Sequence, residues 1–294
     1  MIAAKNKSMS SQSSKINAET VLHFPGGVAT AQILRSEVLS SQQVLSSQAA
    51  SATAEPLLPV LIVLHQETST PGRVGNALRA LGHRLDIRRP RFGDPLPKTL
   101  DGHAGAVIFG GPMSANDPDD FVRQEIDWIS VPLREQRPFL GICLGAQMLA
   151  MQFGARVAPH SEGRTEIGYY PIRPTAAGLE LCPDWPGHVY HWHREGFELP
   201  RGAELLAVGG DFPVQAFRSG HAFGFQFHPD VTYAMMHRWT TRGHERLELP
   251  GACPRHHHFE GRALHDAAER AWLRHFLDDW LTRMPLSVMS EAAE

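Results

Sequence analysis

The sequence predicts an α/β protein in which a mostly parallel central sheet lies between two layers of helices, accompanied by a small antiparallel β portion. From residue 59 onward, apolar runs of strand length alternate with stretches that have the period of a helix. The runs at 59–65 and 104–109 are almost continuously apolar, which is typical of parallel strands buried on both faces. This alternation of strands and helices predicts the three-layer arrangement.

The first strand is expected at 59–65, and a helix follows it because Val74, Leu78 and Leu81 share one helical stripe. Gly82 ends that helix, since glycine is common just past a helix C-terminus. The next strands are expected at 84–87, 104–109 and 139–142, with helices at 121–136 and 144–153. Short strands then follow at 167–172, 188–192, 205–208, 214–217 and 222–227, with helices at 231–242 and 263–283.

Residues 1–57 differ in composition from the rest of the chain. Ser, Gln and Ala dominate there, and Trp and Tyr are absent, so this segment buries little apolar surface. A transit peptide is the weaker alternative, because the segment has a single arginine, Arg35, and three glutamates. We therefore expect a low-complexity, disordered N-terminal extension at 1–57, one domain at 58–284 and a C-terminal tail at 285–294.

Charge and composition argue against several classes of protein. Lys and Arg number 28 against 31 Asp and Glu, so the formal net charge of −3 gives no basic footprint for nucleic acid. Runs of about 18 apolar residues are absent, which argues against a membrane span. Three cysteines cannot form a disulfide framework, so the expected setting is reducing and cytoplasmic.

The 17 histidines raise the question of a metal site. His256, His257, His258 and His265 gather near the last helix, but neither Cys-x-x-Cys nor His-Glu-x-x-His accompanies them. We therefore expect a solvated loop before that helix, and no metal or other cofactor. His191 and His193 alternate on one expected strand, and for these two both a cleft-lining and a structural role stay open.

A candidate nucleophile lies in Gly141-Ile-Cys-Leu-Gly145, between an expected strand and an expected helix. Glycines at both ends allow a sharp turn that thrusts the central side chain outward. Cys143 would then lie next to a helix N-terminus, where the helix dipole favours the thiolate. The alternative is a buried cysteine that acts as a small apolar side chain.

A candidate base and its orienting group lie in Phe227-His-Pro-Asp230. His228 follows an apolar strand, and Asp230, two residues on in extended chain, points the same way. A carboxylate beside His228 would fix its tautomer and stabilise the imidazolium. The alternative is a solvated His-Pro turn at a strand end.

A third motif, Phe109-Gly-Gly-Pro-Met-Ser114, ends a strand with two glycines. Its backbone N–H groups, together with that of Leu144, could face a developing oxyanion. In this order the three motifs resemble the class I, triad-type glutamine amidotransferases, and among them stand-alone proteins similar to the glutaminase domain of GMP synthase. The resemblance covers about 59–281 and implies the family's flavodoxin-like fold.

The resemblance also implies roles for individual residues. Cys143 would attack the side-chain amide of glutamine, His228 would transfer the proton to the departing ammonia, and Asp230 would orient His228. Gly111 and Leu144 would supply the oxyanion N–H groups. Substrate contacts are implied for three further residues, Gln147, Trp192 and Glu195. The family usually has Glu where this chain has Asp230, so the hydrogen bond to His228 needs a small backbone adjustment.

Three functions stay open on this reading. The first is glutamine hydrolysis through a γ-glutamyl thioester, with ammonia released or passed to a separate synthetase partner. The second is hydrolysis of γ-glutamyl peptides or amines by the same triad on a roomier leaving-group side. The third is a non-catalytic regulatory subunit, against which the intact set of Cys143, His228 and Asp230 argues. The expected ligand is a small molecule, with no nucleic acid or membrane.

Overall fold

The computed structural model describes residues 56–282, and the following account concerns these residues. Almost all of the expected extension at 1–57 and all of the expected tail at 285–294 lie outside the described residues. Among the described helices, none combines the length and the apolar character that a membrane span requires.

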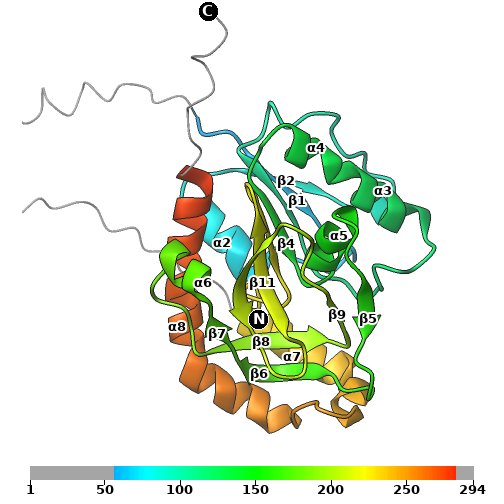
Figure 1. The fold of residues 1–294 in the computed structure, drawn as a ribbon, viewed down its shortest axis with the longest axis vertical. Helices are drawn as coiled ribbons and strands as arrows, with labels where there is room; N and C mark the ends of the chain where they lie inside the picture. The colour runs from blue at the N-terminus through cyan, green and yellow to red at the C-terminus, as the bar shows by residue number, and fades with distance from the viewer. Residues whose placement is uncertain (1–55, 283–294) are drawn as a thin grey trace, which may run out of the picture. The chain divides into compact units, whose positions relative to one another are not determined.

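An eight-stranded sheet forms the centre of the fold, with the strand order β2-β1-β3-β4-β12-β11-β10-β7 (Figure 1). The first five strands in this order pair in parallel, and the last three pair antiparallel. Their bounds are β1 Val60–Val63, β2 Leu85–Arg88, β3 Gly105–Ile108, β4 Phe139–Ile142, β7 Arg173–Pro174, β10 Glu204–Val208, β11 Val214–Ser219 and β12 Ala222–Phe225.

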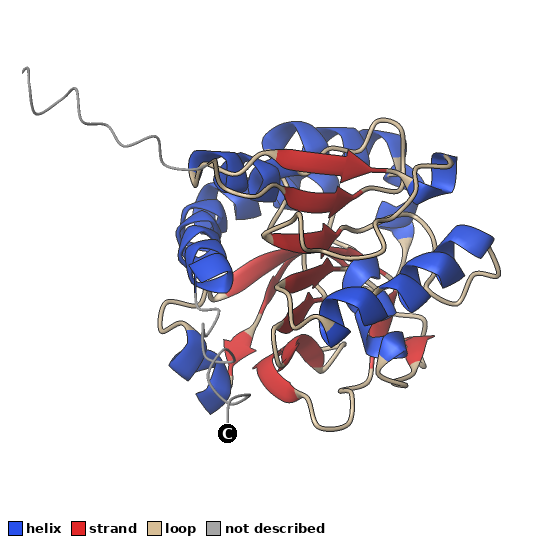
Figure 2. Cartoon of the chain, turned by 90° about the horizontal axis from the view of Figure 1, so that it is seen from above, coloured by secondary structure: helices blue, strands red, loops and turns tan. Residues whose placement is uncertain are grey.

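Helices cover both faces of the sheet, as Figure 2 shows from above. Strand side chains alternate between the faces, so Val60 and Ile62 pack in a cluster with α2 and α8, while Leu61 and Val63 pack with α3, α4 and α5. Both faces of β1 are thus buried, as its apolar run predicts. The helices are α2 Gly72–Ala80, α3 Asp120–Trp128, α4 Ser130–Arg134, α5 Leu144–Gln152, α6 Ala176–Leu181, α7 Tyr233–Arg242 and α8 Arg255–Thr282, with short 3₁₀ turns η1 Pro90–Phe92 and η2 His244–Glu248.

Two small antiparallel sheets accompany the large one. One joins β5 Val157–Pro159 to β9 Glu195–Phe197, and the other joins β6 Glu166–Pro171 to β8 His188–His193. The expected α/β class with a mostly parallel sheet and an added antiparallel portion is therefore confirmed.

Two expected elements differ from the structure. The helix expected at 121–136 is divided into α3 and α4, because Pro132 has no N–H to continue the hydrogen-bond ladder across Ile129. The helix expected at 263–283 begins earlier, at Arg255, so His256–His258 are helical and not a solvated loop. His258 is buried and hydrogen-bonds through Nδ1 to the hydroxyl of Tyr190 at 2.9 Å, which holds this first turn in place.

Candidate active site

The three sequence motifs meet because they follow three neighbouring parallel strands. β4 lies between β3 and β12 in the sheet, and the chain leaves all three strands at the same edge. Gly110 and Gly111 follow β3, Cys143 follows β4, and His228 comes shortly after β12. The carboxyl edge of a parallel sheet is where α/β folds place their binding groups.

Cys143 occupies a strained turn between β4 and α5. Its φ of 50° is positive, which is uncommon for a residue with a side chain and costs conformational energy. A Cβ on Gly141 or Gly145 would overlap neighbouring backbone, so the close approach predicted from the glycine spacing is confirmed. The backbone N–H of Cys143 donates to the carbonyl of Phe225 at 2.7 Å, which ties the turn to β12.

His228 and Asp230 form a buried pair. Nδ1 of His228 lies 3.0 Å from Oδ1 of Asp230, so the shorter aspartate reaches the imidazole. Burial alone would lower the pKa of His228, but the charges of Cys143 and Asp230 and its hydrogen bonds to both raise it to about 10. The pair therefore favours an imidazolium at neutral pH. The N–H of Arg73 in α2 donates to the Asp230 carbonyl at 2.8 Å and fixes this segment.

Cys143 and His228 face each other across Gly110. The side chain of Cys143 is within hydrogen-bonding reach of the His228 imidazole. A Cβ placed on Gly110 would lie 2.6 Å from Cε1 of His228 and 3.4 Å from Cβ of Cys143, so only glycine fits between them. The structure thus brings the three expected catalytic residues together at one edge of the sheet, with His228 hydrogen-bonded to Asp230 and close to Cys143.

The two expected oxyanion donors also lie at this edge. Gly111 belongs to the loop after β3 and lines the cavity beside His228. Leu144 is the first residue of α5, where N–H groups have no partner within the helix. Among the described residues, neither of these two N–H groups donates a hydrogen bond, so both are available to an anion.

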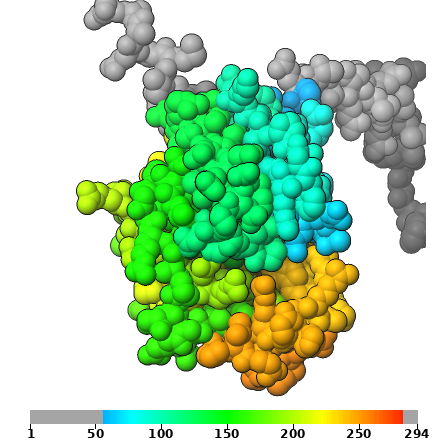
Figure 3. Space-filling model, turned by 90° about the vertical axis from the view of Figure 1, so that its right-hand side faces the viewer, coloured from blue at the N-terminus to red at the C-terminus, as the bar shows by residue number. Residues whose placement is uncertain are grey.

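A cavity of about 240 Å³ opens over His228. One wall is formed by the segment after β1 and the Gly110–Pro112 loop, and the other by α7, η2 and Trp192. In Figure 3 the blue and cyan surface of the first wall meets the yellow-to-orange surface of the second. The cavity is somewhat smaller than sites for drug-sized ligands, which are roughly 300–1,000 Å³, and suits a small metabolite.

The three residues expected to contact substrate do not all reach the cavity. Trp192 lines the cavity, whereas Gln147 and Glu195 are outside its lining. Gln147 is buried, and its amide nitrogen donates to the carbonyl of Glu195 at 2.9 Å. This bond ties α5 to β9, so the side chain of Gln147 has a structural partner.

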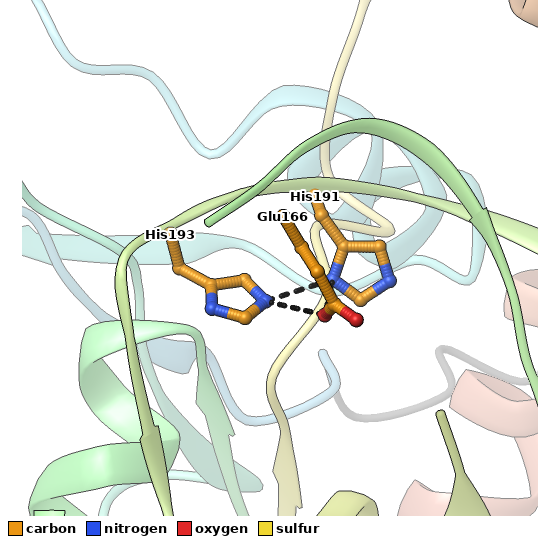
Figure 4. A group of neighbouring side chains, drawn as sticks. All are labelled: Glu166, His191 and His193. Atoms are coloured by element: carbon orange, nitrogen blue, oxygen red, sulfur yellow. Dashed lines mark hydrogen bonds and ion pairs between the residues drawn. The ribbon is translucent and has the colours of Figure 1, made fainter. Parts of the chain in front are cut away.

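Glu166, His191 and His193 form a buried group next to the site, drawn in Figure 4. Nε2 of His193 lies 3.0 Å from Oε2 of Glu166 and 3.0 Å from Nδ1 of His191. These atoms lie close enough together to hold a metal ion. Both histidines therefore face Glu166, and neither is in the lining of the cavity over His228, so their contacts support the structural alternative.

Hydrogen bonds already occupy this buried group. Nδ1 of His193 donates to the carbonyl of Glu195 at 3.0 Å, and Gln215 donates to Glu166 at 2.8 Å. Burial alone would raise the pKa of Glu166, but the charges of His191 and His193 and hydrogen bonds from His193 and Gln215 lower it to about 2. Burial lowers the pKa of His191 to about 3. At neutral pH Glu166 is therefore a carboxylate and His191 a neutral ring.

Comparisons with known proteins agree with this geometry. The family model "Glutamine amidotransferase class-I" matches residues 67–240. The chain belongs to the class I glutamine amidotransferases. Within this family it is similar to the glutamine amidotransferase-like protein YfeJ of Salmonella typhimurium, with 32% identity over 183 residues, 59% of this chain and 76% of that protein.

GMP synthases are further relatives in the family. The glutamine-hydrolysing GMP synthase of Thermomicrobium roseum is 35% identical over 133 residues, 44% of this chain and 24% of the synthase. The match with this chain therefore spans only about a quarter of the length of that synthase. A solved structure of a glutamine amidotransferase from Methylobacillus flagellatus has a TM-score of 0.72 and 26% identity, covering 76% of this chain and 94% of that one. These relatives confirm the family and fold that the motifs predict.

Sequence reasoning missed two groups at this site. His65 and Glu125 support the Gly110 loop from behind, and the position of His65 directly after a buried strand was the available signal. The second group consists of arginines on the cavity wall, Arg238, Arg242 and Arg246. Their spacing of four residues was visible in the sequence, but their position opposite His228 depends on how α7 packs.

Proposed function

We propose that this amidotransferase hydrolyses the side-chain amide of glutamine through Cys143, His228 and Asp230. The observation that carries the proposal is the position of Cys143 at the strained turn, within hydrogen-bonding reach of an imidazole that Asp230 holds. A thiolate next to an imidazolium is the arrangement that nucleophilic cysteines need.

The reaction then has two halves. The Cys143 sulfur forms a bond to the side-chain carbonyl carbon (Cδ) of glutamine while the N–H groups of Gly111 and Leu144 stabilise the oxyanion. The C–N bond breaks as His228 gives its proton to the leaving nitrogen, which departs as ammonia. His228, now neutral, takes a proton from water as the water attacks the γ-glutamyl thioester, and glutamate leaves as the C–S bond breaks.

The ammonia acceptor in this proposal is a separate synthetase. Support comes from the relatives: GMP synthases, described as glutamine-hydrolysing, contain a matching part that is 24% of one chain and 34% of another.

A chloroketone analogue of glutamine tests the proposal. It should attach once per chain, and mass spectrometry should locate it on Cys143, with Cys182 and Cys253 as internal controls. The Cys143→Ala variant should neither take the label nor release ammonia and glutamate from glutamine. Labelling or turnover that survives in this variant would refute the role of Cys143, whereas a wild-type chain that neither takes the label nor turns over glutamine would favour the regulatory-subunit alternative.

A further inference from the structure

The cavity wall opposite the catalytic histidine carries an excess of positive charge. Arg238 and Arg242 lie four residues apart on α7 and so project from one side of the helix, and Arg246 follows on η2. The Arg246 stem and the Trp192 ring approach each other, since a Cβ on Gly243 would lie 3.9 Å from Cδ of Arg246 and 3.2 Å from Cζ2 of Trp192. All three arginines therefore belong to one wall.

No protein carboxylate neutralises this wall. Among residues 56–282, none of the three arginine side chains forms an ion pair or a hydrogen bond with another residue. The cavity has two carboxylates: Asp230 is paired with His228, and Glu245 is exposed and lies 3.8 Å from His244. The chain as a whole has a net charge of −3, so this local excess is a property of the cavity.

Like charges held side by side repel each other. The rings of Trp192 and Trp239 on the same wall are apolar and exclude water, so they strengthen the electric field of the arginines in the cavity. An anionic ligand would relieve this repulsion. Guanidinium groups bind carboxylates with two parallel hydrogen bonds, which makes a carboxylate the best match.

Glutamine alone does not match the charge of this wall. A γ-glutamyl group carries one carboxylate and one ammonium, so it is neutral overall and can occupy one arginine. The remaining arginines call for a second carboxylate. Because the γ-glutamyl half has only one, the second must lie on the amine half of the amide.

We propose that the three arginines form a subsite for a carboxylate on the amine half of a γ-glutamyl amide, so that the enzyme prefers γ-glutamyl amino acids over neutral amides of the same size. This inference rests on the proposed function, because it uses the same thioester chemistry. The C–N bond breaks as His228 protonates the amine, an amino acid leaves in place of ammonia, and water releases glutamate from Cys143.

Two dipeptides of matched size test the subsite. γ-Glutamylglycine carries the second carboxylate, and γ-glutamylglycinamide replaces it with a neutral amide. Glutamate release by the full chain should give a kcat/KM for the acid at least about tenfold above that for the amide, because charge-assisted hydrogen bonds are about twice as strong as neutral ones. Arg238→Gln, Arg242→Gln and Arg246→Gln should each bring this ratio toward one.

The control variant is Arg274→Gln, an exposed arginine on α8 outside the cavity, which should keep the wild-type ratio. Calorimetric binding of both dipeptides to Cys143→Ala protein separates the subsite from turnover. Tighter binding of the acid by Cys143→Ala, together with a wild-type protein that hydrolyses neither glutamine nor either dipeptide, would uphold the subsite and refute the proposed function. Glutamine hydrolysis with equal rates and equal binding for acid and amide would uphold the proposed function and overturn the subsite.

Discussion

Nδ1 of His65 lies 3.2 Å from the carbonyl oxygen of Gly110, and this hydrogen bond holds the peptide group that also carries the N–H of Gly111. In a trans peptide the C=O and the N–H point in opposite directions, so His65 sets where the Gly111 N–H points. Nε2 of His65 lies 2.8 Å from Oε2 of Glu125. Both side chains are fully buried, and neither lines the cavity.

Glu125→Gln should therefore lower kcat for glutamine about ten- to a hundredfold. This loss should not exceed the one caused by removing an oxyanion donor outright, because the Gly111 N–H is still present and only its direction changes. KM should change little, because oxyanion contacts strengthen only in the transition state. Alkylation of Cys143 by iodoacetamide forms no oxyanion and should keep its rate. Steady-state kinetics and the alkylation rate, measured on the same preparation, check this.

The matched control is Glu162→Gln, an exposed loop residue, which should leave both readouts unchanged. An equal fall in kcat and in alkylation rate for Glu125→Gln would show general damage to the site. An unchanged kcat would remove His65 and Glu125 from the positioning of the loop.

Asp230→Asn should shift the alkaline limb of the rate profile to lower pH. The pKa of His228 is raised to about 10, against the effect of burial, partly by the charge and hydrogen bond of Asp230, and catalysis needs the imidazolium as proton donor. Loss of the charge lowers that pKa, and we expect a fall in kcat of about 10²- to 10⁴-fold. The pH dependence of kcat for glutamine measures both effects.

Asp230→Glu restores the charge on a longer side chain and should recover most of the activity and the alkaline limb. If Asp230→Asn shows the wild-type profile, Asp230 has no part in orienting or charging His228.

Glu269→Gln should stabilise the protein at alkaline pH. Burial of Glu269 on α8 raises the pKa of its carboxyl group. The charge of Arg73 and the N–H of Tyr190 lower it, but burial is the larger effect, and the pKa is about 8. The folded state therefore holds a proton that the unfolded chain releases near pH 4.5. Stability due to this group is complete below about pH 4.5 and is lost as pH rises to about 8, by at most about 1.4 kcal/mol per pH unit.

Urea denaturation between pH 5 and 9 should show this loss in the wild-type protein and a flatter profile for Glu269→Gln. Glu260→Gln, an exposed glutamate on the same helix, is the control and should keep the wild-type slope. Parallel profiles for wild type and Glu269→Gln would mean that Glu269 is ionised in the folded protein.

The sequence predicted the parts of the fold and site that depend on local patterns. Apolar runs placed β1, β3 and β4, and the glycines around Cys143 placed the sharp turn. The meeting of Cys143 and His228 followed from the general rule that parallel strands end at one edge. The apolar runs and the glycines lie within a few residues of the strands and the turn that they predict.

Features that depend on distant contacts were not predicted. β7 and β9 have two and three residues, and only their pairing partners define them as strands. His65 gains its partner Glu125 from a helix 60 residues away. His191 and His193 face Glu166 because β6 pairs with β8, and strand alternation alone could not tell that side from the cavity.

The pairing of β4 with β12 also sets when the site comes into being. Phe139 pairs with Ala222, so a long loop of chain must close before this pair of strands forms, and such distant pairings form late in folding. A nascent chain that has emerged only as far as β11 would contain the cysteine but neither the imidazole nor its carboxylate. Under the proposed mechanism, the site therefore becomes active only when β12 joins the sheet, and we expect a chain that is still unfinished to be inactive.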